Sequence, residues 1–269
     1  MPLSLLIAAG LAVAQGAAVG LEVPHEPGLE AVHVAWAERE MPFVRRGDVW
    51  QATIGVDLDV VPGEHAAPIA LRFADGRTAE REQTLEVARV DFPTTALTVE
   101  PRYVELDPAD QARADRESIE IAAIYATLTP EAYWSEPFIV PIPGASDGRN
   151  FGHRRVFNGQ PRAPHSGADL RAGTGTPIHA SNRGRVALAK ELFFSGNAVF
   201  LDHGLGLYSV YLHLSDIGVE PGQIVERGDV IGLAGATGRV TGPHLHWGAR
   251  VLDARVDPFS LLRLAPGGN

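Results

Sequence analysis

Short segments in which apolar and polar residues alternate recur through the first part of the chain, and turn-forming residues separate them. Such alternation places every second side chain on the same face of a strand. Asp75 and Gly76 stand between two of these segments, and this dipeptide is favoured in tight β-hairpins. The pattern predicts a small β-sandwich module over residues 21–105. Its expected strands include residues 31–36, 49–58, 69–73 and 84–90.

The second half of the chain repeats this pattern with a high density of glycine. Segments of about four to eight residues are separated by Gly, Asn and Asp, which is typical of strands joined by short turns. They predict an antiparallel sheet, two-layered or barrel-like, in a C-terminal domain over residues 146–269. The expected strands lie at residues 177–180, 184–189, 197–202 and 207–214.

Between the two β-rich regions the pattern favours a helix. Apolar residues up to Tyr125 are interleaved with Arg and Glu, and Asp107 followed by Pro108 is a typical N-cap and first-turn pair. Four prolines from Pro130 onward then predict an irregular linker, because proline has no N–H to donate. We interpret residues 106–145 as a connecting helix and a Pro-rich linker in a mainly β protein. The helix is either a connector with some packing or a rigid arm between the two modules.

The charge balance of the 269-residue chain limits its partners. It has 33 acidic and 23 basic residues, and the formal charge of −10 disfavours unaided binding to nucleic acid or to an anionic membrane. A hydrophobic content of 45% excludes a disordered polymer. The chain contains no cysteine, so any metal must be held by histidine and carboxylate side chains.

An apolar run from Leu3 to Ala14 opens the chain and ends in small residues. It resembles the core and cleavage site of a signal peptide, although no Lys or Arg precedes it. The run is shorter than the ~20 apolar residues that a membrane span needs. We therefore expect residues 1–20 to be a signal peptide outside the fold. The mature protein is expected to be exported to the periplasm or cell envelope without a membrane span. The alternative is a buried first strand or helix.

Histidines gather in three stretches of the C-terminal domain. His244 and His246 are two residues apart in an extended segment, so their side chains point the same way. Earlier in the chain, His165 and Asp169 stand in a glycine-bearing stretch that predicts a loop or strand edge. Catalytic zinc sites use three protein ligands of these types and leave one position open. A further histidine, His213, ends an aromatic and β-branched run.

These stretches, in this order and spacing, resemble the lysostaphin/LytM-type zinc endopeptidases, which cut peptidoglycan peptides. The resemblance covers about residues 151–261. It implies one zinc ion with three protein ligands, which are His165, Asp169 and His246. It also implies a catalytic pair for proton transfer and oxyanion stabilisation, which is His213 and His244.

Other residues near these motifs are alternative candidates for the metal ligands or for the role of the oxyanion-associated tyrosine. His179 lacks a partner at ligand spacing and is left unassigned, His203 lies in a turn signature, and His153 is a third rival as a metal ligand. Several members of the resembled family carry a tyrosine shortly before the first ligand, and that tyrosine is associated with the oxyanion. No tyrosine stands there in this chain. Asn158 and Arg155 are the candidate substitutes.

The resemblance implies a zinc-dependent endopeptidase that hydrolyses peptide bonds in peptidoglycan cross-links or stem peptides. Two other functions fit the same fold: an inactive cell-wall-binding regulator of another hydrolase, and a secreted metallopeptidase that cuts glycine-rich proteins. The turn at Val225 to Gly228 resembles those of biotinyl or lipoyl carriers, but no lysine stands at its tip. Residues 31–99 contain no ligand cluster, so we expect an independent sandwich that positions the enzyme.

Overall fold

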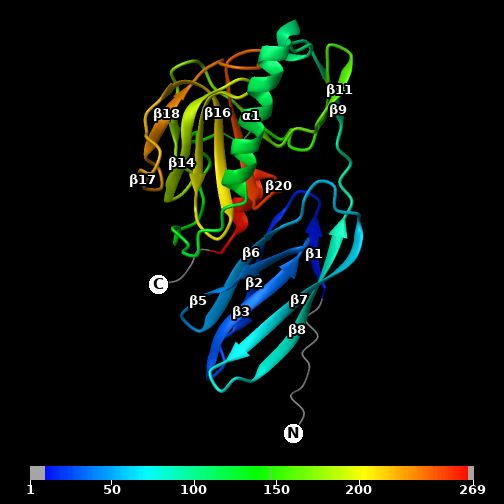
Figure 1. The fold of residues 1–269 in the computed structure, drawn as a ribbon, viewed down its shortest axis with the longest axis vertical. Coiled ribbons are helices and arrows are strands. Elements are labelled where there is room, and N and C mark those ends of the chain that lie inside the picture. Colours follow the sequence, from blue (N-terminus) through cyan, green and yellow to red (C-terminus); the bar gives the residue numbers. More distant parts are fainter. Residues whose placement is uncertain (1–9, 146, 266–269) are drawn as a thin grey trace.

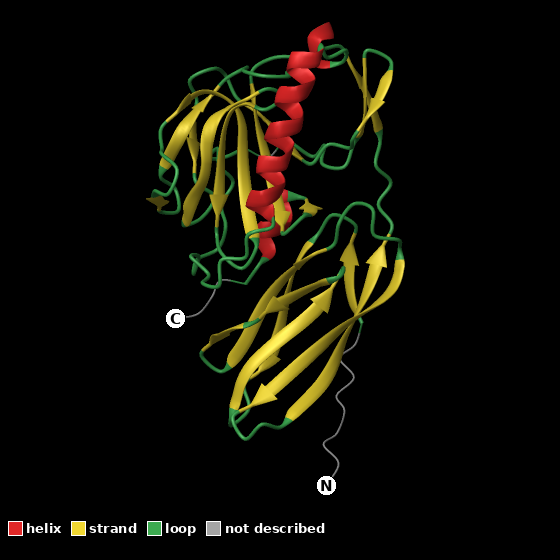
Figure 2. Ribbon diagram, viewed as in Figure 1, coloured by secondary structure: helices red, strands yellow, loops and turns green. Residues whose placement is uncertain are grey.

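The computed structural model describes residues 10–145 and 147–265 of the chain. Figure 1 shows two β-rich parts, with the helix α1, Pro108–Tyr125, lying along the C-terminal one. Strands dominate both parts, and α1 is the only α-helix in the described residues (Figure 2). The expected class is confirmed: a mainly β chain with an N-terminal sandwich, a connecting helix and a C-terminal antiparallel sheet. Within the same ranges, no helix has the length and apolar composition required to cross a membrane.

The N-terminal part is a sandwich of two sheets, with strand orders β1-β8-β7-β3-β4 and β2-β6-β5. The strands of the first sheet are, in that order, Leu11–Ala14, Thr78–Ala88, Gly63–Phe73, Leu29–Trp36 and Arg39–Pro42. Those of the second are Ala18–Pro24, Val49–Gly55 and Val44–Arg46. Buried and exposed residues alternate along β7, so its apolar face packs into the space between the sheets. The expected turn at Gly76 joins β7 to β8, and its φ of +80° suits glycine.

The N-terminal limit of the fold differs from the predicted one. Leu11–Ala14 forms β1, which pairs in parallel with β8, and Ala18–Pro24 forms β2, which pairs with β6. Val13 and Val19 are each 8% exposed, because these strands carry them into the sandwich core. The described part of residues 1–20 thus lies in strands of the sandwich, as the alternative of a buried first strand predicts, while the signal peptide itself stays a prediction. Residues 1–9 lie outside the described residues, and export stays a prediction.

The C-terminal part is an antiparallel sheet with the strand order β12-β19-β16-β15-β14-β17, to which β13, β18 and β20 are attached. Its strands, from β12 to β20, are Gly167–Arg171, Pro177–His179, Gly184–Leu192, Gly196–Asp202, Leu207–Ile217, Ile224–Val225, Val230–Ala234, His244–Val251 and Ala254–Val256. The four strands expected from the sequence are β13 to β16. A 3-10 helix, η2 (Pro258–Arg263), follows β20.

Both faces of this sheet are covered. On one face, α1 packs through Ile121 and Tyr125 onto a cluster of buried side chains from the central strands. On the other face, Val140 and Ile142 of the Pro-rich linker pack against a second cluster. The Asp107 carboxylate accepts hydrogen bonds from the first backbone N–H groups of α1, as its N-cap position predicts. The helix is therefore a connector that packs on the domain.

A small third sheet links the end of the sandwich to the beginning of the C-terminal domain. Strand β9 (Thr94–Leu97) pairs in parallel with β10 (Arg154–Phe157), which forms a hairpin with β11 (Gln160–Arg162). The 3-10 helix η1 (Pro101–Tyr103) and α1 lie in the chain between β9 and β10. Residues assigned to different modules from the sequence thus belong to one sheet.

One hydrophobic core extends across the junction of the two parts. It joins Ile54 of β6 to Val256 of β20 and Leu261 of η2, together with other buried side chains from both sides. An ion pair lies at the same junction, where Arg255 donates from Nε to Asp57 Oδ2 at 3.0 Å and from its backbone N–H to the same oxygen at 2.7 Å. The two parts therefore share one hydrophobic core, as a single domain does. The sequence pattern instead predicts an independent sandwich.

The shared core predicts that the two parts unfold together. Leu261 is 0% exposed there, and Leu261→Ala is expected to lower the free energy of unfolding by about 2–5 kcal/mol, because the shorter side chain leaves a cavity. Thermal unfolding followed by circular dichroism should show one transition at a lower temperature. The control is Ile119→Ala on α1, where the side chain is 72% exposed and the change should stay within about 0.5 kcal/mol. Two transitions, only one of them shifted, would contradict the shared core.

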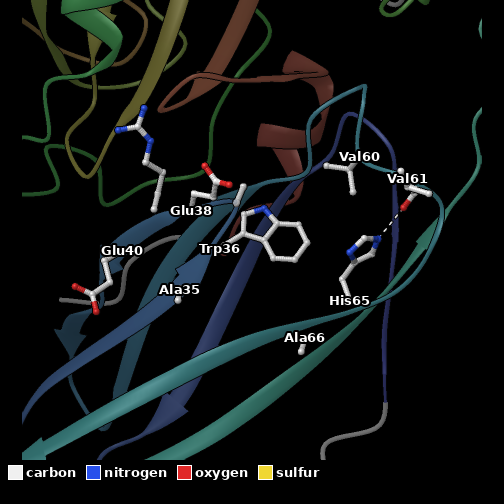
Figure 3. Close-up of a pocket in the computed structure, with 10 residues that line it drawn as sticks. Ala35, Trp36, Glu38, Glu40, Val60, Val61, His65 and Ala66 are labelled. Atoms are coloured by element: carbon white, nitrogen blue, oxygen red, sulfur yellow. Dashed lines mark hydrogen bonds between the residues drawn. The ribbon is translucent and has the colours of Figure 1, made fainter.

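A hollow on the sandwich lies apart from the histidine motifs. It has a volume of about 640 Å³ and is lined in part by Trp36 and His65 (Figure 3). Trp36 Nε1 donates to Gly55 O at 2.8 Å, and the His65 ring contacts Val61 O at 2.7 Å. These polar groups are satisfied within the chain, and the metal-ligand cluster found among the described residues lies elsewhere.

Candidate metal centre

Two neighbouring strands bring the histidine motifs together. In the register of β12 and β19, Asp169 lies directly opposite His246. His165 stands just before β12, in agreement with the expected loop or strand edge. A Cβ on Gly167 would lie 2.6 Å from the Nε2 atom of His246, so only glycine allows this close approach of backbone to ring.

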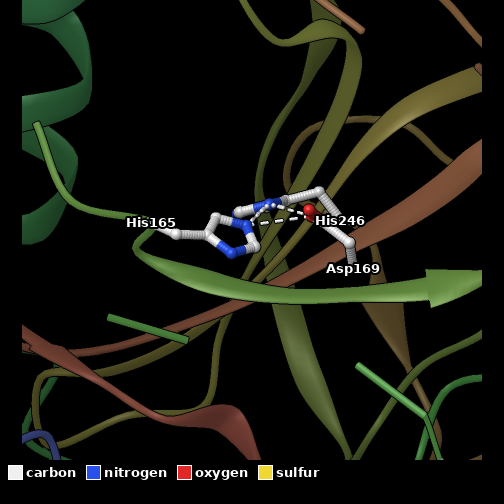
Figure 4. A group of neighbouring side chains, drawn as sticks. All are labelled: His165, Asp169 and His246. Carbon is white, nitrogen blue, oxygen red and sulfur yellow. Dashed lines mark hydrogen bonds and ion pairs between the residues drawn. The ribbon is translucent and has the colours of Figure 1, made fainter. Parts of the chain in front are cut away.

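The possible ligand atoms of His165, Asp169 and His246 form a compact triangle (Figure 4). His165 Nε2 lies 2.8 Å from His246 Nδ1 and 2.9 Å from Asp169 Oδ1, and His246 Nδ1 lies 3.0 Å from the same oxygen. The side chains of the two histidines are 1% and 8% exposed, and that of the aspartate is 21% exposed. Two ring nitrogens and an anionic oxygen at this separation need a shared proton or cation between them.

The triangle fits a zinc ion in its chemistry and its dimensions. Zinc binds histidine nitrogen at about 2.0–2.1 Å, which places two ligands of a tetrahedral ion about 3.3 Å apart. The separations between the three atoms would need to increase by roughly 0.3–0.5 Å to reach that value. Two neutral imidazoles and one carboxylate are also the ligand types that suit a catalytic zinc with a fourth position open.

Asn150 orients two of the three side chains. Its backbone carbonyl lies 2.9 Å from His165 Nδ1, which must therefore carry the proton and leave Nε2 with the lone pair. Its side-chain Oδ1 accepts from the Asp169 backbone N–H at 3.0 Å, and its Nδ2 donates to Asp169 Oδ2 at 3.0 Å. Arg155 donates to the same Oδ2 at 2.9 Å, so Oδ1 is left to face the histidines. The sequence analysis missed Asn150, because no motif spacing marks it and only the fold brings it here.

His213 and His244 lie beside the triangle. Their ring centroids are 5.0 Å apart, and His244 Nε2 lies 3.6 Å from Asp169 Oδ1. His213 Nδ1 contacts Thr237 O at 2.9 Å, and His244 Nδ1 contacts Gly242 O at 2.8 Å. Because a carbonyl oxygen only accepts, each Nδ1 carries the proton and each Nε2 keeps a lone pair. Both rings can therefore act as proton acceptors through Nε2.

The backbone at His213 is unusual. Its φ is +65°, a region that non-glycine residues seldom occupy and that is enriched at functional sites. The pairing of β15 with β16 shifts register around this position. Neighbouring residues of a regular strand point to opposite faces, yet Leu212 and His213 both line one cleft. The irregularity therefore brings His213 to the same side as His246.

Burial favours the neutral form of the site histidines. It lowers the pKa of His213 to about 3, with further lowering from charge on His246 and His244. It also lowers the pKa of His246 to about 4 and lowers the pKa of His165. Burial alone would raise the pKa of Asp169, but the close contacts of its carboxylate with His165 and His246 outweigh it and hold that pKa well below its ordinary value. Neutral imidazoles and an ionised carboxylate are the protonation states that bind a divalent cation.

A cleft of about 610 Å³ opens onto this site. His165, His213 and His246 line it, together with residues of η1 and of the first half of α1. Other residues weighed from the sequence lie away from it: the histidines at 153, 179 and 203 are hydrogen-bonded elsewhere in the fold. The Asn158 side chain forms hydrogen bonds with the backbone of Val99, which precedes η1 in the chain. Of the two candidate substitutes, only Arg155 reaches the site.

The site and the fold have counterparts among known proteins. The sequence profile described as Peptidase family M23 matches residues 163–258. The crystal structure of a Pseudomonas aeruginosa protein assigned to peptidase M23 has 31% sequence identity and a TM-score of 0.66, over 96% of each chain. That similarity covers the sandwich and α1 as well as the sheet that carries the histidines. The chain belongs to peptidase family M23, which confirms the resemblance seen in its sequence.

Two characterised relatives match a shorter segment. The peptidoglycan DD-endopeptidase ShyA of Vibrio cholerae is 48% identical over 99 residues, which are 36% of this chain and 23% of that protein. The DD-carboxypeptidase/endopeptidase Mpg of Neisseria meningitidis is 41% identical over 102 residues, 38% of this chain and 24% of that protein. The matched segment thus spans about a quarter of the length of these relatives.

Proposed function

We propose that this protein is a zinc-dependent endopeptidase that hydrolyses peptide bonds in peptidoglycan cross-links or stem peptides. The observation that carries the proposal is the triangle of His165, Asp169 and His246 with two further histidines beside it. The relative named as a peptidoglycan DD-endopeptidase supports the choice of substrate, and the relative named as a DD-carboxypeptidase/endopeptidase supports the choice of reaction. A peptidoglycan substrate also agrees with the expected export to the periplasm or cell envelope.

A zinc ion held by the triangle would supply a water of lowered pKa and would polarise the carbonyl of the scissile bond. The remaining work falls to side chains of the protein. His213 and His244 each keep a lone pair on Nε2, and we assign to this pair the acceptance of a proton from the water. The ring that has taken up the proton can then donate from Nε2 to the oxyanion and pass the proton to the leaving amine. Arg155 holds Oδ2 of Asp169 and so keeps that carboxylate ionised and oriented.

The inactive-regulator alternative is less well supported. A copy that only binds the cell wall needs none of the proposed ligands or the catalytic pair, yet all five side chains are present and lie close together. The peptidase of glycine-rich proteins has the same site chemistry, so only its substrate separates it from the main proposal.

Mass spectrometry of purified peptidoglycan fragments tests the proposal. Incubation with the full-length chain and zinc should give products that have gained one water per cut, and a chelator should prevent them. A pentaglycine peptide is incubated in parallel. Cleavage of that peptide alone would favour the glycine-rich substrate. Failure to cut either substrate, combined with stimulation of another hydrolase, would favour the regulator.

A further inference from the structure

Three arginine side chains line the cleft: Arg155, Arg162 and Arg239. The whole chain has a formal charge of −10, so a gathering of positive charge at this place is unlike the rest of the molecule. A carboxylate of α1, Asp115, lines the same cleft, where it accepts a hydrogen bond from Gln111 at 2.7 Å. The three arginines differ in whether a carboxylate of the protein itself balances their charge.

The hairpin of β10 and β11 places two of them side by side. Arg155 and Arg162 are direct cross-strand partners, and like charges in that position destabilise a sheet. Arg155 is compensated by its ion pair with Asp169 at 2.9 Å. Within the described residues, the hydrogen bonds of the Arg162 guanidinium go to uncharged acceptors: Pro161 O, Val104 O and Gln160 Oε1.

The guanidinium of Arg239 is half-buried against two aromatic rings. Its Cζ atom lies 4.6 Å from the ring centroid of Phe157 and 4.5 Å from that of Phe194. Such contacts use the flat faces of the group, whereas its N–H donors lie in the plane and point outward. Over the described ranges, no carboxylate forms an ion pair with Arg239. Burial and the neighbouring Arg155 and Arg162 lower its pKa to about 10, so it remains charged at neutral pH.

Both groups are fixed close to the proposed reaction centre. Arg239 lies on the turn that supports His213, because Thr237 O of the same turn contacts His213 Nδ1. The backbone N–H of Arg239 donates to Phe194 O at 2.8 Å, which anchors this turn. On the hairpin, Arg162 is next to Arg155, which contacts Asp169 directly. A ligand group held by these arginines would therefore lie near the bond to be cut.

We propose that Arg162 and Arg239 form a carboxylate-binding subsite, so that the preferred substrate peptide carries a free carboxylate close to the scissile bond. This inference rests on the proposed function for the reaction, but the binding of a carboxylate does not depend on it. A guanidinium offers in-plane donors that match a carboxylate, and charge-assisted hydrogen bonds of this kind are stronger than neutral ones. An amidated peptide would leave the half-buried charge of Arg239 without a partner.

Two matched fragments test the subsite: a cross-linked peptide with free carboxylates, and the same peptide with those carboxylates amidated. With the zinc-loaded wild-type chain, kcat/KM should be about 10–100-fold higher for the acid, the range expected for one or two charge-assisted hydrogen bonds. Arg239→Gln should remove most of this preference by slowing the acid alone. Arg239→Lys should keep part of it, because the charge remains while the planar fork is lost. The matched control is Arg116→Gln, an exposed α1 arginine outside the cleft, which should keep the full preference.

Dissociation constants of the same two peptides, measured with a chelator present, separate the subsite from the reaction. Tighter binding of the acid that depends on Arg239, without cleavage by the zinc-loaded chain, would uphold the subsite and refute the endopeptidase. Equal affinities and equal cleavage rates for acid and amide would refute the subsite and leave the endopeptidase standing. An equal loss of kcat on both peptides in Arg239→Gln would also overturn the subsite. If circular dichroism shows that this variant is unfolded, Arg162→Gln takes its place with the same expectations.

Discussion

Replacing Asp169 by alanine is expected to abolish stoichiometric zinc binding and, with it, peptidase activity. Its Oδ1 is the one anionic atom of the triangle, 2.9 Å and 3.0 Å from the two histidine nitrogens. Without it, two neutral imidazoles remain, and affinity should fall by more than the roughly 10–100-fold seen when only a supporting residue of a metal site is changed. Plasma emission analysis of the dialysed variant measures the metal content directly.

The control for this variant is Asp147→Ala. Asp147 is a nearby carboxylate that accepts a hydrogen bond from the Arg171 backbone at 3.1 Å and lies outside the triangle. It should keep its zinc and its activity. Full zinc occupancy in Asp169→Ala would remove Asp169 from the proposed ligand set, whatever happens to turnover.

Replacing His213 or His244 by alanine is expected to lower kcat by roughly 10²–10⁴-fold, the usual range for a general acid–base group. Zinc should stay bound in both variants, because neither ring belongs to the triangle. The physical reason is the lone pair that each Nε2 keeps once Nδ1 is bonded to a backbone carbonyl. Turnover of a peptidoglycan fragment and metal content are measured on the same preparations.

His179→Ala is the matched control for these two variants, since the Nδ1 of His179 contacts Gly228 O and the residue does not line the cleft. Its turnover should match that of the wild type. Loss of zinc together with activity in His213→Ala or His244→Ala would instead assign that histidine to the metal. Unchanged turnover with zinc bound would exclude it from the chemistry.

Much of the site could be predicted because its residues follow strand periodicity. His244 and His246 share a face of β19 for the same reason that any two alternate residues of a strand do. The hairpin at Gly76 and the N-cap at Asp107 are equally local, since a few neighbouring residues determine each. Asn150 has no such local signal. Its three bonds to His165 and Asp169 form only when a loop closes over β12.

The relation between the two parts was harder to predict, for a different physical reason. Apolar alternation shows that a strand has a buried face but not which element covers it. Val256 and Leu261 would look the same if they packed within their own sheet, whereas they belong to one buried cluster with Ile54 of the sandwich. The apolar run at the N-terminus has the same ambiguity, because export signals and buried strands are both apolar; Val13 is in a strand.

The parallel pairing of β9 with β10 decides where this chain can be cut and rejoined. From Thr94 onward, the chain forms β9, which pairs with β10, the strand that carries Arg155. It then forms α1, which lines part of the cleft. A chimera that exchanges the sandwich for another module must therefore be joined before Thr94. It must also provide new apolar cover for Leu261, which now lies in one buried cluster with side chains of the sandwich. Recombination between relatives should accordingly preserve the two parts as a pair. A fragment of residues 146–269 alone would have an exposed apolar surface and an incomplete cleft.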